Sequence, residues 1–215
     1  MIKKIEIVEK IQSALNGGDD ISDGLSRYHP SDIEANVDEV YTDILQNMFS
    51  QNMRSKMGFD PMLLDDYTRT YNNVPVEYDA VRCEFYSQLP VTTVSLPFNS
   101  SVRFISPQQE QKLQFSPVSN NASVVFSELE VDKVDNVPSF YMESNKVYYS
   151  FPVHDYKKVL MKLVPSFSSL LDDDLIPEPS IVGQRGLITI YDIVVARFRN
   201  MLPEDLINDN NSKQV

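Results

Sequence analysis

The chain has 215 residues, a length that fits one domain, or one domain with a small appendage, and that excludes a second full catalytic domain. Apolar residues make up 42% and charged residues 23%, so the chain can bury a core and is not disordered as a whole. A net charge of −12 argues against sequence-specific nucleic-acid binding, and one cysteine with two histidines excludes disulfide frameworks, thiolate zinc sites and iron–sulfur clusters.

The N-terminal segment, residues 1–59, is predicted to contain two helices. In residues 2–15 apolar side chains recur at spacings of three and four, which is the pattern of an amphipathic helix, and glycines follow it. A longer helix begins at Pro30, because proline suits the first helical position, and its apolar stripe continues to about Met57. This second helix is the clearest element of the sequence.

Residues 60–170 change to the pattern of a β module. Short runs rich in β-branched and aromatic residues recur about every ten to twelve residues and are separated by Pro, Asn and Ser. This spacing predicts a small antiparallel sandwich or barrel, and Asn72 and Asn73 are expected to form a turn. The predicted strands cover residues 81–85, 91–96, 102–105, 113–115, 123–131 and 146–151. Residues 156–164 fit either a strand or a short helix, and a strand is favoured.

Residues 171–202 are predicted to form an acidic connector followed by a helix. The run Asp172 to Asp174 and the prolines after it make a stiff connection that cannot continue a helix. From Leu187 to Leu202 apolar residues return to helical spacing, although the β-branched residues of the first turn disfavour a helix by propensity. The tail, residues 203–215, has too few apolar residues to fold alone, so we expect it to be flexible until a partner binds it. The expected fold class is α+β.

No part of the sequence predicts a membrane span or a secretion signal. No apolar run approaches 18 residues, and Met1 to Lys10 alternates Lys and Glu with Ile instead of forming the apolar centre of a signal peptide. We therefore expect the protein to be made and kept in the cytoplasm, or to leave by lysis, and to have no membrane partner.

Residue types suited to nucleophilic catalysis are few. The imidazoles are His29, just before the helix that opens at Pro30, and His154, in a turn, and neither neighbourhood resembles a site. Cys83 lies inside an alternating strand, where a buried inert thiol is expected rather than a nucleophile. The sequence therefore predicts no catalytic residue, and an enzyme that uses scattered carboxylates is the least favoured interpretation.

Two segments offer weak alternatives for anion or metal binding. The segment Gly183 to Gly186, with Arg185 inside it, is the nearest approach to a phosphate cradle, but a plain loop entering the helix is favoured. Asp172 to Asp174, with Glu178, could supply oxygen ligands to calcium or magnesium, yet consecutive acids rarely point at one centre. A solvated connector is favoured there, and we expect neither a metal nor a cofactor.

Tyrosine and phenylalanine are numerous, with eleven of each. Because neighbouring strand residues face opposite sides of a sheet, we expect Tyr86, Tyr141 and one of Tyr148 or Tyr149 to be exposed. Exposed tyrosines suit interfaces, and the carboxylates beside them favour protein contact over stacking on single-stranded nucleic acid.

The order of these elements resembles that of neck and tail-ring proteins of crAss-like and other short-tailed phages. The resemblance covers most of the chain and is one of organisation and composition rather than of invariant residues. The segment from Ile181 to Leu202 is more β-branched than the family pattern. The features that carry the resemblance are the N-terminal amphipathic helix, the helix Pro30–Met57, the turn Asp60–Pro61, Cys83 with Leu89–Pro90, the strands Val102–Pro107 and Lys146–Phe151, and the helical C-terminal segment with its polar tail.

The resemblance implies a non-enzymatic structural protein of the virion, assembled in the host cytoplasm. Such a protein forms a homo-oligomeric ring, often of twelve copies, that joins the portal and head to the tail and contacts neighbouring portal, neck or tail ring proteins. Genomic DNA would pass through its channel without sequence-specific binding, since an acidic wall repels phosphates. The residues proposed for the interfaces are Tyr86, Tyr141, Tyr149, Arg185, Leu206 and Ile207.

A different class of function stays open at this point. The β module could act as a monomeric or low-order binding module that grips a host-surface carbohydrate or protein, with Tyr86, Tyr141 and Tyr149 forming a concave patch.

Overall fold

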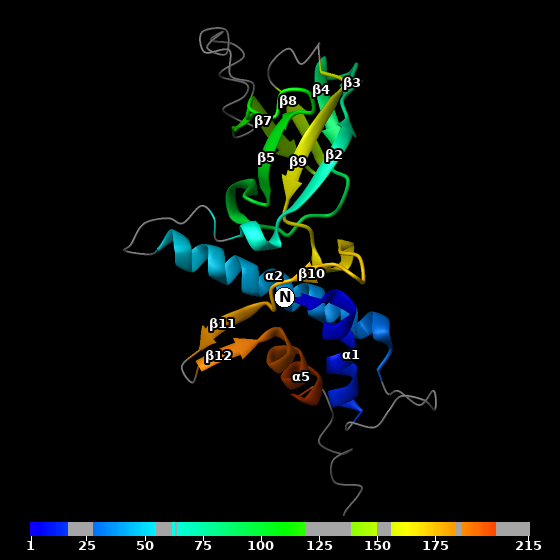
Figure 1. The fold of residues 1–215 in the computed structure, drawn as a ribbon, viewed down its shortest axis with the longest axis vertical. Helices are drawn as coiled ribbons and strands as arrows, with labels where there is room; N and C mark the ends of the chain where they lie inside the picture. Colours follow the sequence, from blue (N-terminus) through cyan, green and yellow to red (C-terminus); the bar gives the residue numbers. More distant parts are fainter. Residues whose placement is uncertain are drawn as a thin grey trace, which may run out of the picture. The chain divides into compact units, whose positions relative to one another are not determined.

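In a computed structural model of the chain, the residues described are 1–16, 28–54, 62, 64–118, 139–149, 156–183 and 186–200. The fold is α+β, as predicted, and the chain divides into two compact units (Figure 1). The β unit is Leu64–Ser169, which compares with the predicted module 60–170. The helical unit joins Met1–Leu63 to Leu170–Val215, so the N-terminal helices and the C-terminal helix, predicted as separate segments, belong together.

The helical unit begins with a two-residue strand and a helix. Strand β1 (Ile2–Lys3) pairs antiparallel with β10 (Leu175–Ile176), and α1 (Lys4–Leu15) follows directly. Ile7 and Ile11 of α1 are buried, as the spacing of apolar residues predicts.

Helix α2 (Pro30–Met53) is the longest element of the structure. It starts where predicted because Pro30 occupies its first turn and His29 caps it, the ring Nδ1 accepting a hydrogen bond of 3.3 Å from the Ser31 amide. The predicted end near Met57 lies outside the described residues. One face of α2 is buried, and its buried residues are Ile33, Val37, Val40, Tyr41, Ile44, Leu45 and Phe49.

The C-terminal part of this unit corrects the predicted helix 187–202. Strand β11 (Ser180–Gly183) pairs antiparallel with β12 (Gly186–Thr189), and α5 begins only at Ile190 and is described to Asn200. The β-branched residues Ile188 and Thr189 therefore lie in a strand, as their propensity favours. In α5, Ile190, Val194 and Phe198 are buried at helical spacing, and the helix packs against both α1 and α2.

The β unit is built from short strands in two sheets. One sheet has the order β2-β9-β5, and the other has the order β3-β4-β8-β7-β6. Every pairing in these two sheets is antiparallel except that of β6 with β7. The strands are β2 (Arg69–Pro75), β3 (Glu77–Asp79), β4 (Glu84–Gln88), β5 (Val102–Pro107), β6 (Ser116–Pro117), β7 (Ser139–Glu143), β8 (Lys146–Tyr149) and β9 (Lys158–Leu163).

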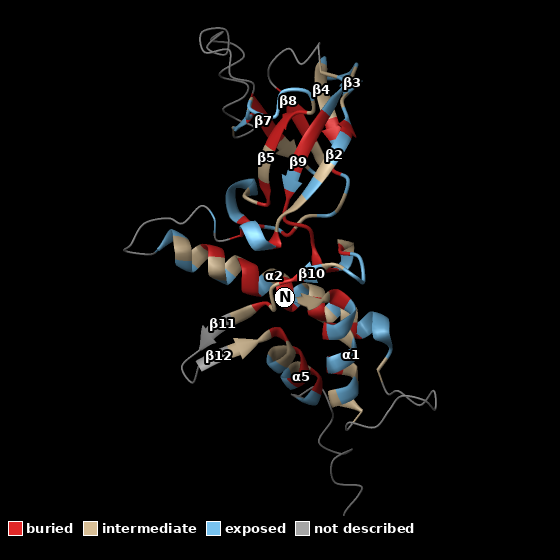
Figure 2. Cartoon of the chain, in the orientation of Figure 1, coloured by how far each residue is buried: buried red, intermediate tan, exposed pale blue. Residues whose placement is uncertain are grey.

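The two sheets contribute to one apolar cluster inside the β unit. Buried residues, drawn in red in Figure 2, occupy much of β5, β8 and β9. The cluster consists of Val74, Leu89, Val102, Ile105, Phe115, Phe140, Val147, Tyr149, Val159, Met161 and Leu163. Burial of this set supplies the main driving force for folding the unit.

Several predicted β-unit elements take another form. Residues 91–96 form only an isolated bridge between Thr93 and Pro165, and residues 113–115 lie outside the strands. The predicted turn at Asn72 and Asn73 is a bulge inside β2, where Asn73 has a φ of 59°. Residues 123–131 and 150–151 lie outside the description. Among the described helices, none is both long enough and apolar enough to cross a membrane.

Candidate interaction surface

Three tyrosines form a row across the outer face of the five-stranded sheet, and we call Tyr86, Tyr148 and Tyr141 the tyrosine row. Tyr86 of β4 pairs with Tyr148 of β8, and Tyr148 pairs with Tyr141 of β7. The ring centroids of Tyr86 and Tyr148 are 5.8 Å apart, and those of Tyr148 and Tyr141 are 5.3 Å apart with nearly parallel planes. Such cross-strand aromatic pairs stabilise a sheet by roughly 0.2–1 kcal/mol each.

The phenols of the row donate to carboxylates on the same face. Tyr86 Oη donates to Glu77 Oε2 at 2.5 Å, and Tyr141 Oη donates to Glu84 Oε2 at 2.5 Å. Tyr148 Oη donates more weakly to Asp79, at 3.5 Å. Burial, followed by the hydrogen bond to Glu84, raises the pKa of the Tyr141 phenol well above its usual range.

Cations lie over the same rings. The guanidinium carbon of Arg82 is 4.7 Å from the centroid of the Tyr148 ring, and Arg82 also makes a two-pronged ion pair with Glu143. Lys146 Nζ is 4.1 Å from the centroid of the Tyr86 ring. The tyrosine row is therefore closely bonded within the protein itself.

The burial of these residues corrects the predicted exposure. Tyr141 and Tyr148 are only 5% and 4% exposed, and Tyr86 is half-buried. Tyr149 is 2% exposed, lies on the opposite face of β8 and donates to Ser87 Oγ at 2.9 Å. The structure therefore brings Tyr86 and Tyr141 together through Tyr148 rather than Tyr149. A row covered in this way offers no open platform for stacking a sugar or a base.

The remaining predicted interface residues, Arg185, Leu206 and Ile207, lie outside the described residues, as does His154. Gly183 pairs with Gly186 at the ends of β11 and β12, so the segment between them connects two strands and does not enter a helix directly. The sequence predicted a loop that leads into the C-terminal helix here, and the structure has a connection between two paired strands instead.

Cys83 is exposed, which corrects the expectation of a buried thiol. It ends a turn between β3 and β4 and has a φ of 57°. The turn forms because Asp79 Oδ1 accepts hydrogen bonds from the amides of Val81 and Arg82, at 3.0 and 3.3 Å. The alternation of residues 81–85 is therefore part turn and part strand.

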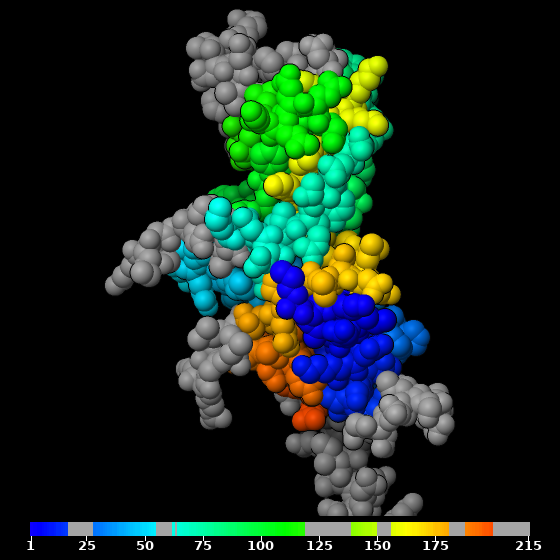
Figure 3. All heavy atoms as spheres, in the orientation of Figure 1, coloured from blue at the N-terminus to red at the C-terminus, as the bar shows by residue number. Residues whose placement is uncertain are grey.

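The acidic connector binds the N-terminus of the chain. The backbone carbonyls of Asp174 and Asp172 accept hydrogen bonds from the amides of Lys4 and Ile5, at 3.1 and 3.2 Å. The Asp173 carboxylate lies 2.9 Å from Lys3 Nζ. In Figure 3 the N-terminal segment (blue) and the connector (yellow to orange) lie side by side on the surface of the helical unit. The described residues contain no cluster of three or more His, Cys, Asp or Glu side chains that could hold a metal.

An exposed turn that the sequence analysis did not single out lies between β4 and β5. Within the short helical turn η2 (Pro97–Asn99), Phe98 and Asn99 have φ values of 57° and 54°, and the Ser100 amide donates to the Pro97 carbonyl at 3.2 Å. This conformation is unfavourable for a residue with a Cβ atom and costs roughly 1–2 kcal/mol at Phe98. The turn holds the Phe98 side chain 83% exposed.

The turn belongs to an uncharged part of the chain. Residues 85–102 contain no Asp, Glu, Lys or Arg, whereas the average composition would place about four charged residues there. Pro90, Ser95, Pro97 and Asn99 of this stretch are exposed together with Phe98. We call residues 90–101 the uncharged loop. Its lack of charge is visible in the sequence, but the exposure of Phe98 is not.

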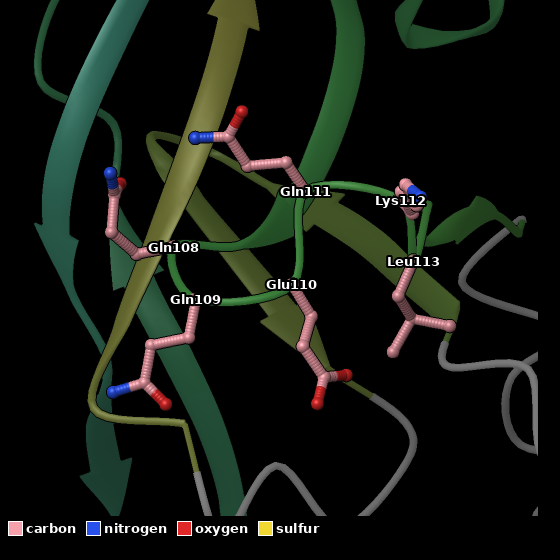
Figure 4. Close-up of a pocket in the computed structure, with 6 residues that line it drawn as sticks. All are labelled: Gln108, Gln109, Glu110, Gln111, Lys112 and Leu113. Atoms are coloured by element: carbon pink, nitrogen blue, oxygen red, sulfur yellow. The ribbon is translucent and has the colours of Figure 1, made fainter.

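A cavity of about 760 Å³ has residues 108–113, one loop, as its described lining. The backbone N–H of Asn73 donates to Gln108 Oε1 at 3.0 Å, and Tyr156 Oη donates to Glu110 at 3.2 Å. These two hydrogen bonds hold parts of the loop in place. In Figure 4, however, Gln111 points away from Gln109 and Glu110. The polar side chains of this loop do not converge on a centre, so the cavity lacks the arrangement of a binding site.

We find no protein family whose sequence profile matches this chain, and no curated protein has a significant sequence match to it.

Proposed function

We propose that this protein is a structural, self-associating component of a phage virion, a ring subunit of the neck or tail that joins the portal and head to the tail. The order of its elements supports this proposal. The single observation that carries the self-association is Phe98, an apolar side chain held 83% exposed at an unfavourable backbone conformation. Strain at an exposed residue persists only where the surrounding structure enforces it, and such residues cluster at functional sites.

Charge supports the uncharged loop as a contact surface between copies. Copies of a chain with a net charge of −12 repel one another over most of their surface. Residues 90–101 carry no charge, so a contact through them brings no like charges directly together. A protruding aromatic side chain with uncharged neighbours suits the centre of a protein interface, where aromatic residues contribute much of the binding energy. Repeated head-to-tail contacts of this kind close into a ring if the rotation between copies permits.

The virion localisation, the twelve copies and the neighbouring portal, neck or tail proteins are part of the same proposal and rest on the resemblance. The net negative charge supports the idea that genomic DNA passes the ring without being held, since DNA affinity comes chiefly from Lys and Arg contacts to phosphate. The rival function, a monomeric binding module with a tyrosine patch, has less support because Tyr141 and Tyr149 are buried.

Light scattering on the full chain, alone and with its genomic neighbours, tests the proposal. We expect masses that are multiples of 24.6 kDa and a loss of assembly in Phe98→Gly. Glycine tolerates the positive φ, so the fold of this variant should keep its stability to within about 1 kcal/mol. Asn99→Gly, in the same turn, is the matched control and should assemble as the wild type does. A wild-type chain that stays near 24.6 kDa under all these conditions, or a Phe98→Gly chain that assembles normally, would overturn the proposal.

A further inference from the structure

A second cavity lies on the outer face of the three-stranded sheet of the β unit, where β2, β9 and β5 run side by side (Figure 1). Its volume is about 310 Å³, and the described residues that line it all belong to the β unit. They are Asp65, Thr68, Thr70, Arg103, Phe104 and Lys162. We propose that this cavity binds a phosphate group, either as the free ion or as part of a small phosphorylated molecule.

A β-bulge brings the first cation into the cavity. Val102 pairs with Leu163 and Phe104 pairs with Lys162, so Arg103 is an extra residue in β5 opposite a continuous stretch of β9. A bulge of this kind bends the strand and redirects a side chain, and bulges are frequent next to functional sites. As a result, two consecutive residues of β5, Arg103 and Phe104, both line the same cavity.

The sheet register brings the second cation and a hydroxyl to the same place. Lys162 of β9 pairs with Thr70 of β2 on one side and with Phe104 of β5 on the other. Lys162 Nζ lies 5.5 Å from the centroid of the Phe104 ring. The ammonium of Lys162 and the hydroxyl of Thr70 therefore add donors beside the guanidinium of Arg103.

The described lining residues carry a net charge opposite in sign to that of the protein. Arg103 and Lys162 are opposed by one lining carboxylate, Asp65, in a chain whose net charge is −12. The contact between Arg103 Nη2 and Asp65 Oδ1 is 3.6 Å long, which is beyond the usual range of a direct hydrogen bond. The Arg103 side chain is 18% exposed and that of Asp65 is 56% exposed, so the carboxylate can move into water while the guanidinium stays in place.

Phosphate, a tetrahedral oxyanion that can carry two charges, matches this set of donors better than chloride does. A guanidinium offers two parallel N–H groups to phosphate oxygens, and an ammonium adds a point charge that favours a dianion. The Phe104 ring supplies an apolar wall, so a phosphomonoester with a small apolar group should bind at least as well as the free ion. This inference uses different residues from the proposed self-association and does not depend on it.

Titration of the full-length protein with inorganic phosphate and with phenyl phosphate, followed by calorimetry and by the thermal unfolding temperature, tests the site. Sodium chloride at equal ionic strength is the reference. We expect both probes to bind and to raise the unfolding temperature, because a ligand that binds only the folded state stabilises it. Lys162→Gln should weaken binding by about tenfold or more, since it removes a charge-assisted bond.

Lys158→Gln is the matched control, because Lys158 is an exposed lysine of the same strand that does not line the cavity. It should bind both probes as the wild type does. Arg103→Lys keeps the positive charge but loses the two parallel N–H groups of the guanidinium. It should weaken phosphate binding and leave the unfolding temperature in sodium chloride unchanged. The proposal is wrong if neither probe exceeds the effect of chloride, or if Lys162→Gln and Lys158→Gln bind equally well.

Discussion

The ammonium of Lys4 donates a hydrogen bond of 3.0 Å to the backbone carbonyl of Leu170, 166 residues away in the chain. The same Nζ atom lies 2.6 Å from the Glu34 carboxylate, and the Lys4 side chain is only 7% exposed. One buried cation thus joins the first turn of α1 to α2 and to Leu170, the residue just before the acidic connector. A buried charge is tolerated because its donors meet acceptors on both sides.

Lys4→Met should destabilise the protein by about 1–3 kcal/mol, because it leaves the Leu170 carbonyl and the Glu34 carboxylate without this donor. Urea unfolding followed by circular dichroism measures the loss. Lys3→Met is the control, since the Lys3–Asp173 pair is largely exposed and such pairs contribute about 1 kcal/mol or less. Equal losses in the two variants would contradict the role given to Lys4.

The guanidinium of Arg197 in α5 forms ion pairs with two carboxylates of α2. Its Nη1 lies 3.1 Å from Glu39 and its Nη2 donates to Asp43 at 3.1 Å, two carboxylates one helical turn apart. Arg197→Lys keeps the charge but cannot reach both acceptors, so we expect a loss of about 0.5–1 kcal/mol that shrinks at high salt. Denaturation at low and high ionic strength checks this, and Arg199→Lys, on the exposed side of α5, should be neutral.

The start of α5 depends on a reciprocal cap. Asp192 Oδ2 accepts from the Thr189 amide at 3.0 Å and from the Thr189 hydroxyl at 2.8 Å, and these bonds lower the pKa of the Asp192 carboxyl. Asp192→Asn should cost about 1 kcal/mol at neutral pH.

The lowered pKa of Asp192 sets the pH dependence of that loss. The stabilising effect of the ionised carboxylate is complete above the unfolded pKa near 4 and disappears as the pH falls through the lower folded pKa. The difference between the wild type and Asp192→Asn should therefore shrink as urea unfolding is repeated below about pH 4. A difference that stays constant down to strongly acidic pH would show that the carboxylate charge plays no part.

Tyr149 should contribute to the loss of stability at alkaline pH. Burial raises the pKa of its phenol well above the usual value near 10, so the unfolded chain releases this proton at a lower pH than the folded chain does. Its contribution is complete below about pH 10 and is lost progressively as the pH rises further.

Tyr149→Phe should lower stability by about 1 kcal/mol at neutral pH, because Ser87 loses the donor of a buried hydrogen bond. The variant should also lose less stability than the wild type between neutral pH and the alkaline range. The difference in phenolate absorbance between the wild type and Tyr149→Phe, recorded during alkaline unfolding, isolates this one of eleven tyrosines and checks the order of the two steps. Ionisation of Tyr149 before unfolding would contradict its burial.

Local patterns gave good predictions where a periodic apolar stripe meets a clear boundary. Pro30 and the apolar stripe that follows it predicted the start and the buried face of α2. The run of β-branched and aromatic residues that begins at Lys146 predicted the start of β8. The pattern failed at Thr93 and at residues 113–115, where β-branched or apolar residues make a single bridge or lie beside a strand. Strand pairing depends on distant partners, which composition does not reveal.

The tyrosines show the same division. Alternation determines that Tyr148 and Tyr149 face opposite sides of β8, but only the pairing of β8 with β4 and β7 decides that Tyr148 joins the row while Tyr149 enters the core. The conformation and exposure of Phe98, and the bulge that turns Arg103 into a cavity, likewise depend on hydrogen bonds between separate strands and turns.

The amino-acid sequence by itself determined the net charge, the helical faces and the two-residue alternation of the strands, because these depend on neighbours a few positions apart. Tertiary structure alone decided that the N-terminal helices and the C-terminal helix form one unit and which polar groups share a cavity. The physical reason is that burial and strand register are set by contacts between residues far apart in sequence, and these contacts exist only once the chain has folded.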